Sequence, residues 1–167
     1  MIQVYTGNGK GKTTAALGLA LRAAGAGLKV YIAQFIKGKI CSEHHALKKI
    51  KNITVEQFGG SCFIRNRPSL KDRLLANEGL KRVKEIITMK IYDIVIIDEI
   101  NIALKLKLIK LQDVIKLIKD VPCKTELILT GRCAHPSILK LADLVSEIKE
   151  KKHYFHKGVK ARIGIEY

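Results

Sequence analysis

Short apolar stretches rich in β-branched residues recur along the chain and alternate with longer segments whose apolar residues follow helical spacing. The apolar stretches are nearly continuous, which is typical of strands buried on both faces of a parallel sheet. The pattern therefore predicts an α/β fold in which helices cover both faces of a mostly parallel sheet of five or six strands. Strands are expected at residues 2–5, 29–35, 53–57, 94–97, 126–130 and 144–148, and helices at about 13–26, 70–89, 111–119 and 136–142.

Three segments lack a regular pattern. Residues 36–52 are loosely basic, residues 58–68 form a glycine-containing loop, and residues 152–167 form a polar and aromatic tail. No internal repeat or low-complexity linker divides the chain, and 47% of its 167 residues are hydrophobic. We therefore expect residues 1–167 to form a single domain with a substantial core.

A glycine-rich segment, Gly7 to Thr14, directly follows the first predicted strand. Its glycines let backbone N–H groups converge on an anion, the next helix adds its positive end, and Lys12 and Thr13 supply a cation and a metal-binding hydroxyl. Only three residues separate Gly7 from Gly11, one fewer than in the usual phosphate loop. The expected polyphosphate-binding residues are Gly7, Asn8, Gly9, Lys10, Gly11, Lys12, Thr13 and Thr14, of which Lys10 could equally face solvent.

Charged residues also occur where two apolar strands are expected to end. Asp98 and Glu99 follow the strand at residues 94–97, and Arg132 follows the strand at residues 126–130. Open α/β sheets place ligand chemistry at the carboxyl ends of their strands, where these carboxylates could hold Mg²⁺ beside the loop threonine. The alternative for Asp98 and Glu99 is a helix N-cap with a first-turn acid. Arg132 could neutralise phosphate charge or lie on the surface.

The formal net charge of +16 suggests a polyanionic partner. Lysine is spread along every predicted element instead of along one helix face, so nucleic-acid binding is not favoured. The sequence contains neither an apolar run of 18 residues nor a basic-then-apolar leader. We therefore expect a cytoplasmic protein that makes no contact with a membrane.

The cysteines and histidines do not form a recognisable metal site. No C-x-x-C pair is present, and a protein that acts on intracellular nucleotides works among reduced thiols. We interpret Cys41, Cys62, Cys123 and Cys133 as free thiols, and His44, His45 and His135 as polar surface or loop histidines.

Several motifs, in chain order, resemble the ATP:corrinoid adenosyltransferases of cobalamin synthesis and salvage, which are proteins of the RecA-like P-loop class. The resemblance covers nearly the whole chain. Its most specific parts are the shortened loop GNGKGKTT, the strand end QFIKG and the tail KGVKARIGIEY. The segments VYIAQFIKG, IIDEINIAL, LTGR and LADLVSEI also match.

The resemblance implies transfer of the 5′-deoxyadenosyl group of ATP to the Co(I) of a reduced corrinoid, with release of triphosphate. Co(I) is itself a strong nucleophile, so the protein must supply positioning and charge, not a nucleophile or a general base. The resemblance further implies that Lys12 and the loop amides bind phosphate, that Thr13 and Glu99 ligate Mg²⁺ or Mn²⁺, and that Asp98 lies behind them. Lys12, Thr13 and Glu99 are thus the expected catalytic residues.

The same resemblance places Lys160 and Ala161 near the adenosine, and it predicts a homodimer and an external electron donor such as a flavoprotein. It leaves open whether the corrinoid is cobalamin or an a,c-diamide precursor. Better-known members carry an N-terminal extension that can cover the site, whereas this chain begins at the first strand, so more open corrinoid capture is expected.

The loop that contacts the corrinoid in those members carries a Phe-x-Trp pair. In this chain Cys62 and Ile64 occupy the two aromatic positions, and Phe63 is the aromatic residue that remains. Phe63 either contacts the corrinoid or packs within its loop.

Two other classes of function fit parts of the sequence. A RecA-like ATPase or nucleic-acid-binding P-loop protein would use the loop, Asp98-Glu99 and the positive charge, but it would also need a water-activating residue and an arginine from a neighbouring subunit. A non-catalytic module would sense ATP and dock a partner on its basic surface.

Overall fold

A computed structural model describes residues 1–60 and 67–167 of the chain. Its centre is a sheet of six strands in the order β3-β2-β4-β5-β1-β6, and every neighbouring pair is parallel. The α/β fold with a parallel sheet of five or six strands is therefore confirmed. The strands are β1 (Ile2–Thr6), β2 (Val30–Phe35), β3 (Ile53–Phe58), β4 (Ile94–Asp98), β5 (Glu126–Thr130) and β6 (Leu144–Glu147).

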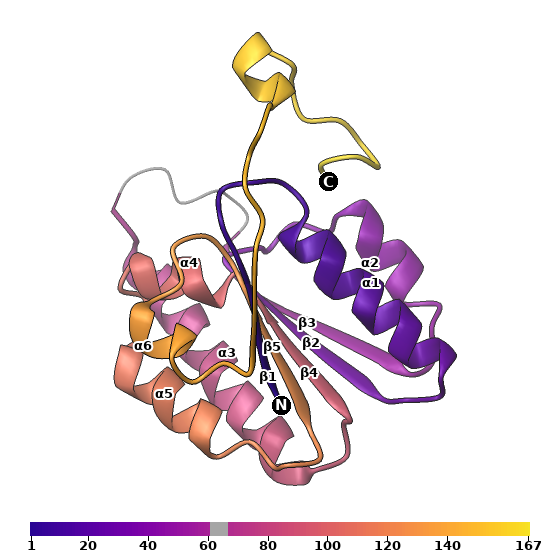
Figure 1. Cartoon of the computed structure of the whole chain (residues 1–167), viewed down its shortest axis with the longest axis vertical. Coiled ribbons are helices and arrows are strands. Elements are labelled where there is room, and N and C mark those ends of the chain that lie inside the picture. The colour runs from indigo at the N-terminus through magenta and orange to yellow at the C-terminus, as the bar shows by residue number, and fades with distance from the viewer. Residues whose placement is uncertain (61–66) are drawn as a thin grey trace.

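Helices cover both faces of this sheet, as predicted (Figure 1). Of the helices in the described residues, two pack on one face and four on the other, and a short 3₁₀ helix lies in the C-terminal tail. The first face carries α1 (Lys12–Gly25) and α2 (Ser42–Leu47). The second carries α3 (Leu70–Met89), α4 (Ile100–Lys105), α5 (Leu111–Lys119) and α6 (Pro136–Leu139), and the 3₁₀ helix η1 is Tyr154–Lys157.

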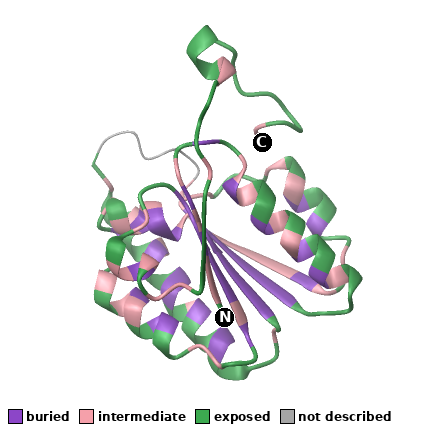
Figure 2. Ribbon diagram, viewed as in Figure 1, coloured by how far each residue is buried: buried purple, intermediate pink, exposed green. Residues whose placement is uncertain are grey.

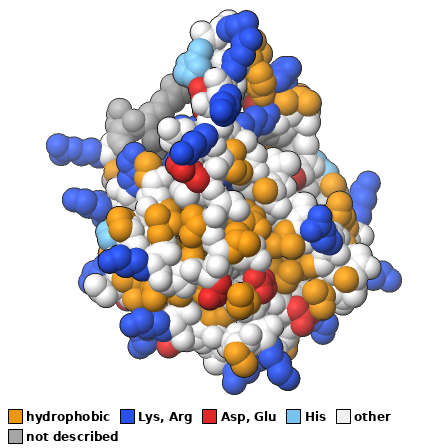
Figure 3. Space-filling view, in the orientation of Figure 1, with side chains coloured by type: hydrophobic (Ala, Val, Ile, Leu, Met, Phe, Trp, Pro, Cys, Tyr) orange, Lys and Arg blue, Asp and Glu red, His pale blue; other side chains and the backbone are white. Residues whose placement is uncertain are grey.

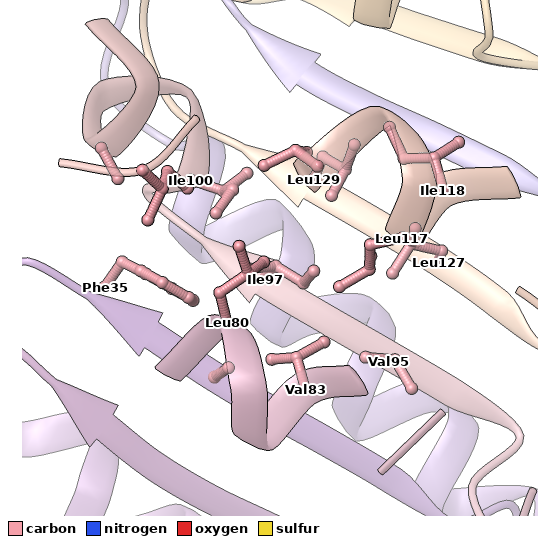
Figure 4. Close-up of a cluster of buried hydrophobic side chains, with 14 of the residues drawn as sticks. Phe35, Leu80, Val83, Val95, Ile97, Ile100, Leu117, Ile118, Leu127 and Leu129 are labelled. Carbon is pink, nitrogen blue, oxygen red and sulfur yellow. The ribbon is translucent and has the colours of Figure 1, made fainter. Parts of the chain in front are cut away.

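Burial follows this layering. β2 and β4 are buried along their whole length and β5 is buried after its first residue, whereas the helices bury only the side that faces the sheet (Figure 2). The apolar residues of alternate strand positions divide into two clusters, one under α1 and α2 and one under α3 to α6. The larger cluster, shown in Figure 4, includes Phe35, Leu80, Val83, Val95, Ile97, Ile100, Leu117, Ile118, Leu127 and Leu129.

Two short helices were not predicted from the sequence, and one predicted helix is shorter than expected. Residues 36–52 contain α2, and α4 follows directly after β4. Each has six residues, which is too short for a helical repeat to show in the pattern. The helix expected at residues 136–142 ends at Leu139.

The connections bring the functional segments to one edge of the sheet. The carboxyl ends of β4, β5 and β1, which are neighbours in the sheet, all point to this edge. The tail after β6 rises beyond the same edge, and its end returns toward α1 and α2 (Figure 1). Among the helices that the structure describes, none is long and apolar enough to cross a membrane.

Candidate active site

The phosphate loop joins β1 to α1 in a conformation that requires glycine at several positions. Gly7 and Gly11 have φ angles of 97° and 117°, which side chains rarely tolerate. The Gly9 amide donates a hydrogen bond of 2.7 Å to the carbonyl oxygen of Ile148, just after β6. A Cβ atom on Gly7 or Gly9 would collide with the Ile148 backbone or side chain. The shortened loop is thus packed against the end of β6.

Lys12 begins α1 and points back into the loop. Its ammonium donates a 2.6 Å hydrogen bond to the Gly9 carbonyl oxygen, and the residue is buried. Burial lowers the pKa of Lys12, and the nearby Arg132 lowers it further, against the opposing effect of Glu99 and Asp98. A bound phosphate would give this poorly solvated cation a stronger partner than a single carbonyl.

Asp98 lies at the end of β4 and organises the centre of the site. Its Oδ1 accepts hydrogen bonds from the hydroxyls of Thr13, at 2.8 Å, and Thr130, at 2.6 Å. Its Oδ2 accepts from Gln34 Nε2 at 3.2 Å and from Lys37 Nζ at 3.1 Å. The carboxylate is 1% exposed, so these four donors replace its water shell. Because the Thr13 hydroxyl donates its hydrogen bond to Asp98, the lone pairs of the Thr13 oxygen are left for another partner.

Glu99 is the N-cap residue of α4, but its carboxylate does not cap the helix. Its backbone has a φ angle of 61°, which is uncommon for a non-glycine residue, and its amide donates to Thr130 Oγ1 at 3.0 Å. Burial raises the pKa of Glu99 and the neighbouring Asp98 raises it further, while Lys37, Lys12 and Arg132 act in the opposite direction. A strained backbone with a desolvated, uncapped carboxylate is typical of a functional position.

Lys12, Thr13 and Glu99 line one cavity of about 530 Å³. Of the residues predicted to bind nucleotide or metal, the cavity brings together Gly9, Lys10, Gly11, Lys12, Thr13, Thr14, Glu99 and Arg132. Gly7 and Asn8 form the strand side of the loop and do not line it, and neither does Lys160, which is exposed. Phe63 lies outside the described residues, so its role stays a prediction. Lys37, Ser42, Glu43 and part of the tail complete the wall.

Lys10 lines the nucleotide cavity, and its side chain also contacts the C-terminal tail. Its ammonium donates hydrogen bonds of 2.8 Å to the Tyr154 hydroxyl, 2.9 Å to the Ile165 carbonyl and 2.8 Å to Glu166 Oε1. The Ser42 hydroxyl donates to the Tyr167 carbonyl at 2.9 Å, on the opposite wall. Through these contacts the tail extends across the mouth of the nucleotide cavity.

A second cavity, of about 930 Å³, lies on the α3 to α6 side of the sheet. Its inner wall is apolar and includes Leu104, Leu108 and Ala134. Arg132 lines the first cavity and the next residue, Cys133, lines the second, so the two cavities lie on either side of the loop after β5. A large apolar group could therefore lie next to a nucleotide held by the phosphate loop.

The interpretation of His44 as a surface or loop residue is wrong, since it is 4% exposed and lies in α2. The ligand atoms of Cys41, Glu43 and His44 lie within 4.8 Å of one another. Both ring nitrogens of His44 already have hydrogen-bond partners, however, Nδ1 in the Cys41 amide and Nε2 in Gln34 Oε1, so neither is free to bind a metal ion in this arrangement. The described cysteines Cys41, Cys123 and Cys133 are free thiols, as predicted.

Sequence reasoning missed the donors that surround Asp98. Gln34 and Lys37 belong to the QFIKG strand end, which marks the family resemblance but gives these two residues no role by itself. A glutamine inside an otherwise apolar strand is a signal that could have identified the first of them, because a buried carboxamide needs hydrogen-bond partners.

The site thus consists of a phosphate loop and an adjoining apolar cavity. Comparison with known proteins identifies the family to which it belongs. The sequence profile of the family described as "ATP:corrinoid adenosyltransferase BtuR/CobO/CobP" matches residues 1–167. The chain belongs to the ATP:corrinoid adenosyltransferases. It transfers the adenosyl group of ATP to a reduced corrinoid, and the ATPase alternative is not favoured.

Individual relatives agree with this assignment. The chain is 38% identical to the corrinoid adenosyltransferase of Escherichia coli K12 over 169 residues, which cover all of this chain and 85% of that protein. It is 35% identical to the corrinoid adenosyltransferase CobA of Salmonella typhimurium, with the same coverage. A KaiC-like protein from Pyrococcus horikoshii has the same fold, with a TM-score of 0.59 and 19% identity over 90% of this chain and 74% of that one.

Proposed function

We propose that this adenosyltransferase acts on cobalamin or an a,c-diamide precursor through direct attack of Co(I) on C5′ of ATP. The two electrons of the new cobalt–carbon bond come from Co(I), and those of the broken C5′–O bond leave with triphosphate. The protein's task is to hold ATP and to stabilise the charge that collects on the leaving group. Lys12 and the amides of the shortened loop carry out that task.

The observation that carries this proposal is the arrangement of Thr13 and Glu99 around the phosphate loop. The Thr13 hydroxyl donates a hydrogen bond to Asp98, which leaves the lone pairs of its oxygen available to a metal ion. The Glu99 carboxylate lines the same cavity and does not cap α4. Oxygen ligands of this kind suit Mg²⁺ or Mn²⁺. When bound, the ion would neutralise charge on the triphosphate, with Thr13 and Glu99 as its protein ligands and Asp98 behind Thr13.

The corrinoid is proposed to lie against the apolar cavity on the other side of the loop after β5. A corrin ring is a large and mainly apolar body, and this cavity has the size of a ligand site. Its position beside Arg132 and Cys133 would bring the ring next to the nucleotide without displacing the loop.

We further propose that the protein is a homodimer and receives electrons from an external donor such as a flavoprotein. Strand β6 lies at an edge of the sheet, and its Leu144 and Val145 side chains are exposed. Hydrophobic side chains spread over the middle of the face in Figure 3, while lysines and arginines surround it. An apolar sheet edge of this kind is covered in most native proteins. Analytical ultracentrifugation of the wild type and of Val145→Lys tests the proposed dimer. The wild type should sediment as a dimer, and the added charge at position 145 should raise the dimer dissociation constant.

The reaction itself is tested with ATP, Mg²⁺ and chemically reduced cobalamin or its a,c-diamide precursor, without oxygen. We expect a light-sensitive alkylcorrinoid and one triphosphate per product. Release of orthophosphate in the absence of corrinoid would overturn the proposal, because it would show hydrolysis at the γ-phosphate.

A further inference from the structure

A buried chain of hydrogen bonds leads from the active site to α2. Asp98 Oδ2 accepts from Gln34 Nε2 at 3.2 Å, and Gln34 Oε1 lies 2.6 Å from His44 Nε2. His44 Nδ1 lies 2.9 Å from the Cys41 amide, at the start of α2. Gln34 is fully buried and His44 nearly so. From Asp98 to His44, the chain therefore runs through the protein interior.

The direction of the hydrogen bonds in this chain follows from its Asp98 end. The Asp98 carboxylate can only accept, so the Gln34 carboxamide turns its NH₂ group toward Asp98 and its Oε1 toward His44. His44 Nε2 therefore carries a hydrogen and donates to Gln34 Oε1, while Nδ1 accepts from the Cys41 amide and also lies 3.2 Å from the Cys41 carbonyl oxygen. The opposite orientation would place Gln34 Oε1 against the Asp98 carboxylate and leave both oxygens without a proton between them.

The same chain connects two walls of the nucleotide cavity. His44 is preceded in α2 by Ser42 and Glu43, which line that cavity. At the other end, Asp98 accepts a hydrogen bond from the hydroxyl of Thr13, the proposed metal ligand. The position of α2 and the orientation of the Thr13 hydroxyl are therefore linked through two buried side chains.

We propose that His44 and Gln34 are positioning residues for adenosyl transfer. They hold Asp98 in the orientation that accepts the hydrogen bond from Thr13, so that the lone pairs of the Thr13 hydroxyl would face a metal ion bound with ATP. This inference rests on the proposed function of Thr13 as a metal ligand. Without the donor from Gln34, the Asp98 carboxylate would turn toward its remaining donors, and the Thr13 hydroxyl would lose its fixed direction.

A simpler role for His44 would be to cap α2, because its Nδ1 accepts the Cys41 amide. Two substitutions separate the roles. The amide of glutamine reaches about as far as Nε2, so His44→Gln retains a donor toward Gln34 and loses the cap. Asparagine is shorter and places its oxygen near the position of Nδ1, so His44→Asn retains the cap and loses the donor.

The experiment compares both variants with the wild type in three measurements. Calorimetric titration of Mn²⁺ into the protein with bound ATP gives metal affinity, a coupled assay gives the rate of transfer, and thermal unfolding gives stability. We expect His44→Asn to lose roughly 10- to 100-fold in metal affinity and in rate, the usual effect of removing a group behind a metal ligand. His44→Gln should remain within about threefold of the wild type in metal affinity and in transfer rate, a much smaller change than that expected for His44→Asn. Its thermal unfolding temperature can fall, because the cap is lost.

Equal losses in the two variants, or unchanged metal affinity in His44→Asn, would overturn the inference and leave His44 as a cap. Gln34→Leu breaks the chain at its other end and must reproduce the effect of His44→Asn; it also serves if that variant does not fold. Failure of the proposed function is distinguishable, because it would appear as a wild-type protein that binds Mn²⁺ and ATP but forms no alkylcorrinoid.

Discussion

The Thr13 hydroxyl donates a hydrogen bond of 2.8 Å to Asp98 Oδ1. Thr13 is the second residue of α1 and Asp98 is the last residue of β4, so the contact joins the start of the helix after the phosphate loop to the sheet. It also decides which oxygen atoms remain available to a metal ion. The two oxygens of Asp98 accept from four donors. Among the described residues, by contrast, no side chain donates a hydrogen bond to the Thr13 hydroxyl or to the Glu99 carboxylate.

Substitution at Thr13 tests this division of roles. Thr13→Ala removes the hydroxyl, so we expect transfer to fall by roughly 100-fold, as when one stabilising group is removed from a reaction centre. Thr13→Ser retains the hydroxyl and should stay close to the wild type. The measurement is the initial rate of alkylcorrinoid formation at several Mg²⁺ concentrations. Similar rates in Thr13→Ala and Thr13→Ser would exclude a role for the hydroxyl.

Glu99→Gln removes a negative charge at almost constant volume. If Glu99 is a metal ligand, transfer should fall by at least about 100-fold, beyond the loss usual for residues behind the ligands, and Mn²⁺ affinity should fall with it. Glu78→Gln makes the same chemical change on the exposed side of α3 and is the matched control. A Glu99→Gln variant with unchanged Mn²⁺ affinity would contradict the assignment.

Lys10 is expected to hold the tail across the nucleotide cavity. Lys10→Ala removes three hydrogen bonds to the tail, so we expect faster amide hydrogen exchange at residues 154–166 and a higher KM for ATP. Lys51→Ala, at an exposed turn, is the control. If amide hydrogen exchange in the tail is unchanged in Lys10→Ala, the contacts of Lys10 do not hold the tail in position.

The contact between Lys10 and Glu166 of the tail should weaken only as the pH falls. Hydrogen bonds from Arg162, Lys10 and Tyr154 lower the pKa of Glu166 well below its ordinary value. A group with a lowered pKa in the folded state contributes stability above its ordinary pKa and loses it as the pH falls toward the lowered value. We therefore expect the tail to stay protected from exchange through pH 5, and Glu166→Gln to remove that protection at neutral pH.

The corrinoid position is tested by filling the second cavity. Ala134→Phe places a large side chain on its wall and should raise the KM for the corrinoid several-fold, with the KM for ATP unchanged. The KM for ATP thus serves as an internal control for the fold. An equal rise in both constants would mean that the change disturbs the loop after β5 instead of a corrinoid site.

The sequence predicted those parts of the site whose residues are contiguous or follow an apolar strand. The phosphate loop is a single segment, Asp98 and Glu99 come directly after the apolar strand at residues 94–97, and Arg132 comes two residues after the largely apolar strand at residues 126–130. Parallel pairing then brings the ends of these strands together, so residue order alone is enough to place both segments at one edge of the sheet.

The remainder depended on contacts between distant segments. Lys10 meets Tyr154 across 144 residues, and no local pattern indicates which end of the chain its ammonium will reach. His44 stands in a basic segment beside a second histidine, and its burial follows only from the way in which α2 packs on the sheet. Partners of this kind are determined by tertiary structure, not by spacing along the chain.

The hydrogen bond from Gly9 to Ile148 limits how the phosphate loop could be exchanged between proteins. A loop of ordinary length, transplanted from a nucleotide hydrolase, would carry one more residue between its glycines and would press on the backbone that follows β6. Residues near Ile148 would therefore have to be transplanted together with the loop. In families that vary this spacing, insertions in the loop and changes after the last strand should accompany one another.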